Sequence, residues 1–213
     1  MLINKIKISK QIVYLLGLAL LLNLLRVVLF KDTHFLYMLW NIFLAFIPFI
    51  ISSFLLLRIS KDNFFKPLFI VGFIFWFIFL PNAPYVITDF IHLGRIHSVP
   101  VMYDSFLLFA SAWVSLLAGL TSLVQMKKML SLRFSQKITD IIILITILFT
   151  SFGVYLGRYL RFNSWDLFIS HDSIITSIWK IFTQSNNYAN VYGYTALFFI
   201  FIYTAYKSFD LDK

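Results

Sequence analysis

The sequence predicts an all-α integral membrane protein, a six-transmembrane-helix bundle with a short amphipathic or re-entrant helix after the third span. The chain has 213 residues, of which 61% are hydrophobic and 20% aromatic, and its mean hydropathy is +0.87. Such a composition leaves too little polar surface to cover a water-soluble globule of this size. A membrane-crossing helix needs roughly 20 mostly apolar residues. The apolar blocks therefore indicate one membrane domain with spans at about 12–29, 36–57, 64–80, 106–126, 138–160 and 189–206.

The first span follows a basic N-terminal segment and looks at first like a signal peptide. Its apolar run is too long for a signal peptide and lacks an Ala-x-Ala-like cleavage site, so we interpret it as an uncleaved helix. Asn23 and Arg26 lie near its outer end. We expect Arg26 to extend its guanidinium toward the lipid headgroups, whereas a functional Arg26 would face the bundle.

Small residues recur at helical spacing in three spans, which is typical of helix packing faces in membranes. These stripes are Asn41, Ala45, Pro48 and Ser52 in the second span, Ser111, Ser115, Gly119 and Ser122 in the fourth, and Thr146, Thr150, Gly153 and Gly157 in the fifth. A proline is tolerated in such a helix when neighbouring groups satisfy the freed carbonyl.

The third span stops at Pro81, and a new helix over about residues 83–93 is predicted after it. Asn82 can cap this helix, and Pro84 suits its first turn because the amide it lacks would be unpaired there anyway. At 3.6 residues per turn, one face carries Tyr85, Asp89 and His92, and the opposite face carries Val86, Phe90 and Leu93. This helix is too short to span, so we expect it at the interface or re-entering the protein, with its polar face toward water or a cavity.

Basic residues are distributed unequally between alternate connections, which predicts the orientation. Of the 18 lysines and arginines, twelve fall on the side that carries both termini and six on the other. We therefore expect a multi-pass protein of a bacterial cell membrane with cytoplasmic termini, and with residues 81–104 and 162–188 outside. The net charge of +9 reflects this topology, since no nucleic-acid-binding motif accompanies it.

The residue inventory restricts the possible chemistry. The chain has no cysteine, which excludes disulfides, iron–sulfur clusters and thiolate metal sites or nucleophiles. All nine acidic residues are aspartates, so the candidates for acid–base catalysis are few. A metal would need histidine, aspartate or water as ligands, and no sequence motif specifies a metal or cofactor.

Two long motifs resemble a known family. LPNAPYVITDFIHL from Leu80 to Leu93, followed by Pro100 and Tyr103-Asp104, and YLGRYLRFNSWD from Tyr155 to Asp166 are similar to signature segments of the bacterial membrane proteins grouped as domain of unknown function 1361. The similarity extends roughly from the second span to the sixth. It implies a multi-pass membrane protein and no specific activity.

Joining the two motifs gives a candidate site at the outer pole. Asp89, His92 and Asp104 are the candidate acid–base groups or metal ligands, and Arg158 and Arg161 are the candidate anion-binding groups. The same site would include Asn82, Tyr85 and Asp166. Alternatively, Asp89 and Asp104 form structural ion pairs with Arg158, Arg161 or Arg95, because charges near the hydrocarbon need partners. We expect His34, His97 and His171 to be ordinary loop residues.

Three classes of function follow from these alternatives. The first is a membrane enzyme acting on a lipid-linked or anionic substrate; the second is a transporter or channel component; the third is a non-catalytic partner of another membrane protein. One closed polar cluster would favour the enzyme, and a continuous polar path would favour transport. Polar groups paired beneath an apolar lateral groove would favour the partner.

Overall fold

The structure is a computed structural model that describes residues 10–60, 62, 64, 66–94, 99–166, 176–180 and 188–210. The described residues are predominantly helical and contain no strand. The all-α class predicted from composition is therefore confirmed. The chain divides into two compact units, Met1–Arg133 and Phe134–Lys213. A single membrane domain over the whole chain stays a prediction.

Unit 1 begins with a long helix, a tight connection, and a short 3-10 helix that leads directly into a second long helix. α1 covers Lys10–Phe30, the short 3-10 helix η2 covers His34–Leu36, and α2 covers Tyr37–Arg58. Lys31 has a φ of 51°, a left-handed conformation that reverses the chain directly after α1. Pro48 lies buried inside α2 without ending it, as expected for a membrane helix with close neighbours.

The third spanning segment continues past the break in the sequence motif and covers Pro67–His92. α3 covers Pro67–Phe79, with proline at its start where the missing amide costs nothing. The chain then continues helically through α4 (Asn82–Tyr85) and the 3-10 helix η4 (Val86–His92). Gly94, at a φ of 75°, follows the end of η4. The predicted break is present, but the segment after it extends α3 alongside α2 and α5.

The helix type of η4 corrects the predicted faces. In a 3-10 helix residues i and i+3 eclipse one another, so Val86, Asp89 and His92 share a side. Val86 and Asp89 are both buried, although the 3.6-residue period placed them on opposite faces. The predicted polar face is therefore divided, because Asp89 is buried with Val86 whereas the exposed residue of η4 is the apolar Ile91.

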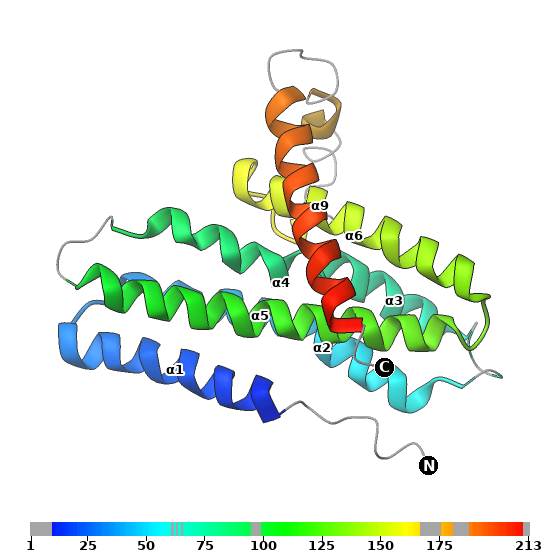
Figure 1. The fold of residues 1–213 in the computed structure, drawn as a ribbon, viewed down its shortest axis with the longest axis horizontal. Coiled ribbons are helices and arrows are strands. Elements are labelled where there is room, and N and C mark those ends of the chain that lie inside the picture. The colour runs from blue at the N-terminus through cyan, green and yellow to red at the C-terminus, as the bar shows by residue number, and fades with distance from the viewer. Residues whose placement is uncertain are drawn as a thin grey trace. The chain divides into compact units, whose positions relative to one another are not determined.

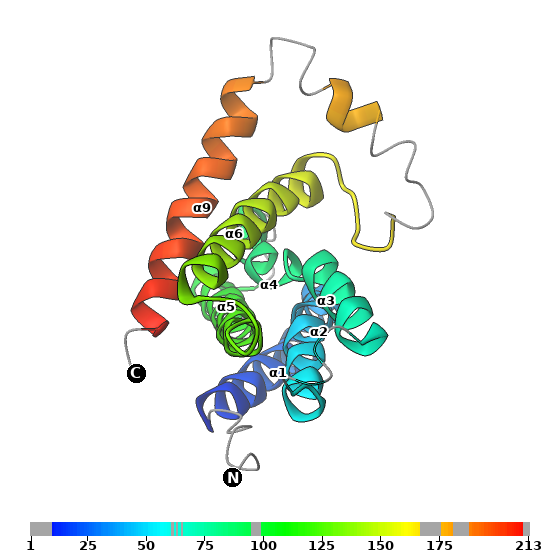
Figure 2. The same cartoon turned by 90° about the vertical axis from the view of Figure 1, so that its right-hand side faces the viewer.

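α5 (Val101–Leu130) is the central helix of unit 1 and contacts α1, α2, α4 and η4 (Figures 1 and 2). At 1.5 Å per residue its 30 residues extend about 45 Å, which is longer than the hydrocarbon core. Its small-residue stripe is fully buried, as predicted: Ser111, Ser115, Gly119 and Ser122. In α2, Ala45, Pro48 and Ser52 of the corresponding stripe are buried as well.

Gly119 gives a direct test of this packing. A Cβ added there would lie 2.6 Å from the Cβ of Ala83, far inside van der Waals contact. We expect Gly119→Ala to lower the free energy of unfolding by roughly 1–3 kcal/mol, measured by thermal unfolding of the purified protein in detergent. Gly17→Ala is the matched control, because nothing lies within 4 Å of that position. Equal stability of the two variants would contradict the close approach of α4 and α5.

Unit 2 contains α6 (Gln136–Tyr159), a short helical stretch at residues 176–180, and α9 (Tyr188–Asp210). α6 and α9 pack together. Tyr155 and Val191 form a small core between them, with Phe152, Leu156 and Leu160 packed against it.

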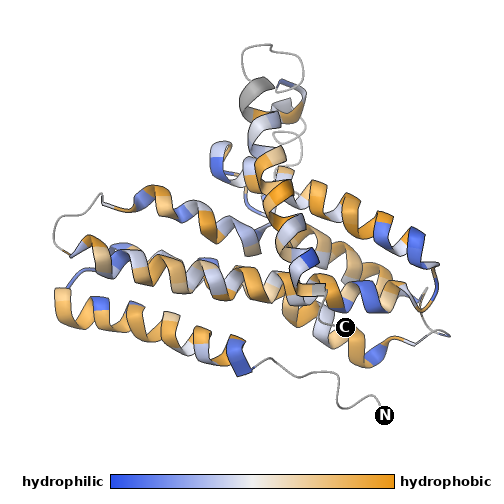
Figure 3. Cartoon of the chain, viewed as in Figure 1, coloured by the Kyte–Doolittle hydropathy of each residue, from blue (hydrophilic) through white to orange (hydrophobic). Residues whose placement is uncertain are grey.

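Five helical segments within the described residues are long and apolar enough to cross a membrane. They are Lys10–Phe30, His34–Arg58, Pro67–His92, Val101–Leu130 and Gln136–Tyr159. α9, the sixth predicted span, is not among them. Figure 3 shows hydrophobic residues along most of each helix and hydrophilic residues concentrated near helix ends. This pattern fits helices that contact the lipid bilayer.

Candidate functional site

A buried arginine joins the first and fourth spans in unit 1. Arg26, on α1, is 1% exposed. Its Nε donates to Oδ1 of Asp104 at 2.8 Å, and its Nη2 donates to Oδ2 of the same carboxylate at 3.2 Å. This two-point contact of a planar guanidinium with a carboxylate is a strong form of ion pair. It connects residues 78 positions apart in the sequence.

The remaining side of Arg26 is also occupied. Its Nη1 donates to Oδ1 of Asp32, and its guanidinium carbon lies 4.7 Å from the centre of the Phe35 ring. The left-handed turn at Lys31 brings Asp32 back over the end of α1. We call Arg26, Asp32, Phe35 and Asp104 the Arg26 cluster. The expectation that Arg26 reaches the headgroups is wrong. Its guanidinium is buried and binds two carboxylates inside the fold, those of Asp32 and Asp104.

Asp104 has a different partner from those expected. It is 3% exposed and lies in the first turn of α5, where the helix dipole favours a negative charge. Both of its oxygens accept bonds from Arg26. A second contact supports the same pairing of helices, since the Tyr103 hydroxyl donates to the Leu22 carbonyl at 2.6 Å. Asp104 thus ties α5 to α1.

Asp89 lies in a separate environment. Its side chain is on η4 and is 1% exposed. Asn41 Nδ2, from α2, donates to its Oδ2 at 2.8 Å. His92 follows one 3-10 turn later and is half-buried. We call Asn41, Asp89 and His92 the Asp89 cluster: a carboxylate held by a neutral amide, with an imidazole on the same side of the helix.

Aromatic contacts connect the two clusters. The Tyr37 ring lies 6.0 Å from the His92 ring and 6.3 Å from the His34 ring. The backbone amide of His34 donates to Asp32 Oδ1 at 2.7 Å. His34, expected to be an ordinary loop residue, therefore contacts the Arg26 cluster and the Tyr37 ring, and the Tyr37 ring contacts His92 of the Asp89 cluster. The polar groups at this end of unit 1 form one contiguous group.

Two predicted site residues lie in the turn before η4. Asn82 does not cap the following helix; its Nδ2 donates backward to the Phe79 carbonyl at 2.8 Å, satisfying the end of α3. Tyr85 is half-buried, and its carbonyl accepts a bond from the Thr88 hydroxyl at 2.6 Å. Both residues shape the transition from α3 to η4.

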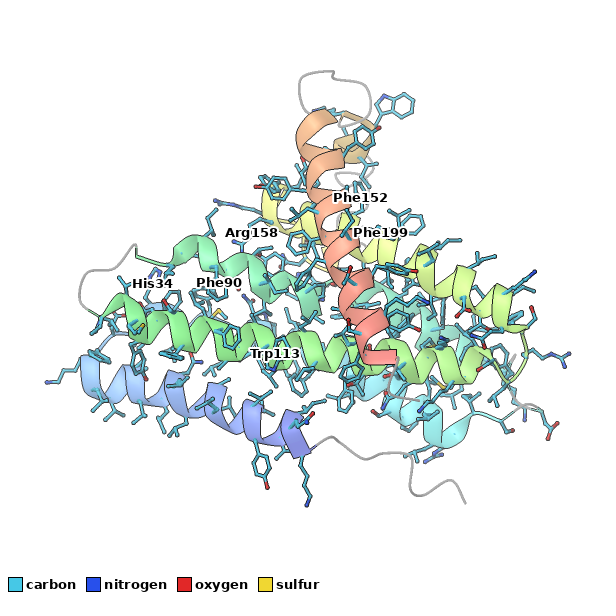
Figure 4. All side chains as sticks on the ribbon, viewed as in Figure 1. His34, Phe90, Trp113, Phe152, Arg158 and Phe199 are labelled. Carbon is cyan, nitrogen blue, oxygen red and sulfur yellow. The ribbon has the colours of Figure 1, made fainter. Side chains whose placement is uncertain are left out.

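The predicted anion-binding residues belong to unit 2. Arg158 lies in the last turn of α6 and is half-buried (Figure 4). Arg161 follows the helix and is exposed, with a φ of 58°. Asp166 accepts a bond from the backbone amide of Asn163 at 2.7 Å and closes a local turn. The convergence of these residues with Asp89 or Asp104 stays a prediction.

The profile of the family described as "Protein of unknown function (DUF1361)" matches residues 40–204 of the chain. The chain belongs to this family. Comparison with curated proteins finds no match, and comparison with solved structures finds none either. The DUF1361 match includes Asn41, Asp89, Asp104 and both arginines of unit 2, whereas Arg26 and Asp32 lie before it.

Metal binding has no support in the part of the DUF1361 protein that the structure describes. No group of three histidine or aspartate side chains lies close enough there to hold a metal ion. Asp104 is occupied by Arg26, so the three predicted ligands Asp89, His92 and Asp104 do not gather around one point. Arg95, His97, His171 and Asp172 lie outside the described residues.

Reasoning from the sequence missed three residues that complete the site. Asp32 follows the first span directly, Asn41 belongs to a stripe assigned to packing, and Tyr37 begins α2. A signal was present for Asn41, because an amide inside an apolar segment needs a hydrogen-bond partner. Nothing local indicated that this partner is Asp89, 48 residues away.

Proposed function

We propose that this protein is a membrane enzyme of the extracytoplasmic pole, in which Asp89 and His92 are the reacting groups and the substrate is lipid-linked or anionic. One observation carries the proposal. A carboxylate that is 1% exposed in a membrane-spanning segment is held by the neutral Asn41 amide, one turn from a half-buried imidazole. Ionisable groups at such positions are costly and usually functional. Carboxylate and imidazole together can accept and donate a proton.

The distribution of polar groups favours an enzyme over a transporter. A second buried polar group lies along the same helices, where Ser52 donates to Gln125 at 2.6 Å and Trp76 donates to Ser122 at 3.2 Å. Between Asn41 and Ser52, α2 buries Ala45 and Phe49. A transport path needs polar groups that continue from one side to the other. The polar residues described in unit 1 are instead gathered in separate groups.

A carbodiimide tests the chemistry of Asp89 without knowledge of the substrate. Dicyclohexylcarbodiimide enters membranes and reacts with a carboxyl group in its protonated form. We expect it to label Asp89, increasingly as the pH falls, because a proton-exchanging group must populate that form. Asp104 should stay unlabelled, since Arg26 engages both of its oxygens. Mass spectrometry of digested membranes locates the label, and Asp89→Asn is the control. Labelling of Asp104 in preference to Asp89 would contradict the proposal that Asp89 is the reacting carboxylate.

The orientation is part of the proposal, with both termini in the cytoplasm of a bacterial cell. In unit 1, Lys10 begins α1, Arg58 ends α2, and Lys127 and Lys128 lie in the last turn of α5. These antiparallel helix ends carry the basic residues that favour the cytoplasmic side. The Arg26 and Asp89 clusters lie at the opposite helix ends.

Single cysteines test this orientation, because the chain has none of its own. We expect Ser98→Cys and Ser173→Cys to react with a membrane-impermeant maleimide in intact cells. Ser131→Cys, after the end of α5, should react only after the cells are opened. Labelling of Ser131→Cys alone in intact cells would invert the topology.

A further inference from the structure

The end of α6 has a strained backbone at an arginine. The amides of Leu160 and Phe162 both donate to the Leu156 carbonyl, at 3.1 and 3.4 Å, and Arg161 between them has a φ of 58°. Arg161 directly follows the C-cap residue Leu160, at the position where many helices end in a left-handed residue that is usually glycine. A side chain at this conformation is disfavoured because its Cβ crowds the following carbonyl. The chain therefore carries a guanidinium where backbone geometry favours having no side chain.

The helix end itself does not require this second arginine. A cation in the last turn stabilises the helix dipole, and Arg158 already occupies that turn. Arg161 is exposed, and its guanidinium has no hydrogen-bond or ion-pair partner among the described residues of unit 2. Strain at a position that the structure does not need is typical of binding sites.

An exposed aromatic surface adjoins the two arginines. The rings of Tyr155 and Tyr159 stack at 4.9 Å, and Tyr194 from α9 meets Tyr159 edge-on at 4.7 Å. Tyr159 and Tyr194 remain 45% and 42% exposed. This end of unit 2 thus combines two cations with apolar rings that a hydrocarbon chain can contact.

We propose that Arg158 and Arg161 bind the phosphate monoester of a membrane lipid, with Tyr159 and Tyr194 against the first part of its chain. The proposal rests on the proposed function, because it names the class of lipid on which the enzyme acts. Two guanidinium groups match a phosphate monoester, whose charge is about −1.5 to −2 at neutral pH. Arginine also presents a planar fork that suits phosphate oxygens. A phospholipid phosphodiester carries a single negative charge, so we expect it to bind the two arginines more weakly.

Arg161→Gly separates a ligand role from a structural role, because the two predict opposite results. Glycine relieves the left-handed strain, so the midpoint of thermal unfolding should be unchanged or raised. Binding of farnesyl phosphate to the full-length protein in phosphatidylcholine nanodiscs should weaken about ten-fold or more, as expected for loss of a charged hydrogen bond. Lower stability with unchanged affinity would overturn the proposal.

Lys31→Gly is the matched control, because Lys31 is the other non-glycine residue with positive φ among those described. It should leave farnesyl phosphate binding unchanged. Arg158→Lys keeps the charge and removes the fork, so we expect weaker binding at wild-type stability. In a second arm, phosphatidylglycerol replaces farnesyl phosphate. Equal sensitivity of both lipids to Arg161→Gly would mean a general anionic-lipid contact and would overturn the monoester assignment.

Asp89→Asn keeps this proposal distinct from the catalytic one. That variant should bind farnesyl phosphate normally, since Asp89 is assigned to chemistry and not to headgroup binding. Normal binding by Arg161→Gly, together with loss of function in Asp89→Asn, would reject phosphate-monoester binding by the two arginines and would still support the catalytic role of Asp89. Weak binding by Arg161→Gly, together with full function of Asp89→Asn, would support the lipid-binding site and reject the catalytic role of Asp89.

Discussion

Arg26→Leu should lower the free energy of unfolding by about 3–5 kcal/mol, because it removes one partner of a buried ion pair and leaves Asp104 uncompensated. Asp104 is 3% exposed, and both of its oxygens are bonded to Arg26. The substitution also removes the contacts with Asp32 and the Phe35 ring. The fraction of folded protein in membranes and the thermal midpoint in detergent measure the loss.

Substitution of Asp104 shows whether the loss of stability in Arg26→Leu comes from the Arg26–Asp104 ion pair. Adding Asp104→Asn to Arg26→Leu should recover part of the stability, since the buried charge is then gone, and a double-mutant cycle gives the coupling. Arg26→Lys should lie between wild type and Arg26→Leu, because lysine keeps the charge and lacks the fork. Wild-type stability of Arg26→Leu would contradict the burial of this arginine.

Asp89→Asn should abolish function while leaving the protein folded. The amide is nearly isosteric with the carboxylate, and its oxygen can still accept the bond that Asn41 now donates to Asp89 Oδ2 at 2.8 Å. It cannot act as a general base, a role that contributes 10²- to 10⁴-fold in rate. In a deletion strain, the variant should therefore reach wild-type abundance yet fail to complement, and any lipid-linked or anionic compound that accumulates in the deletion should accumulate to the same level in the variant.

The control makes the same chemical change elsewhere. Asp140, at the start of α6, accepts bonds from Gln136 at 3.1 and 3.0 Å, and Asp140→Asn should complement fully. His92→Gln should lose function as Asp89→Asn does. Reduced abundance of Asp89→Asn would assign the residue to structure or assembly. Wild-type behaviour of both Asp89→Asn and His92→Gln would remove the Asp89 cluster from the mechanism.

The sequence alone determined the elements that depend on local composition. Apolar blocks of membrane-spanning length predicted the long helices, the break after Leu80 coincides with the boundary between α3 and α4, and Gly94 follows the end of η4. The small-residue stripe of α5 was recognisable because helical spacing and residue size are both local properties. The family resemblance also came from contiguous motifs, and the profile match over residues 40–204 confirms it.

Only the tertiary structure decided how the charges pair. An arginine near a helix end can reach the headgroups or turn inward, and the outcome depends on which groups face it across the bundle. For Arg26 those groups are Asp32, returned by the turn at Lys31, and Asp104, 78 residues away. Sequence order contains no information on the rotation of α1 about its axis, so this ion pair could not be predicted.

The same limit applied to Asp89. Its burial follows from the 3-10 form of η4, which brings it to the side of Val86. Val86 packs in a core with Ala83, Leu107 and Leu108, so contacts with α5 compete with the local preference for 3.6 residues per turn. Helix length and apolar character are local and were readable in advance. The choice of helix type, and with it the burial of the Asp89 carboxylate beside Asn41, was made by packing between distant segments.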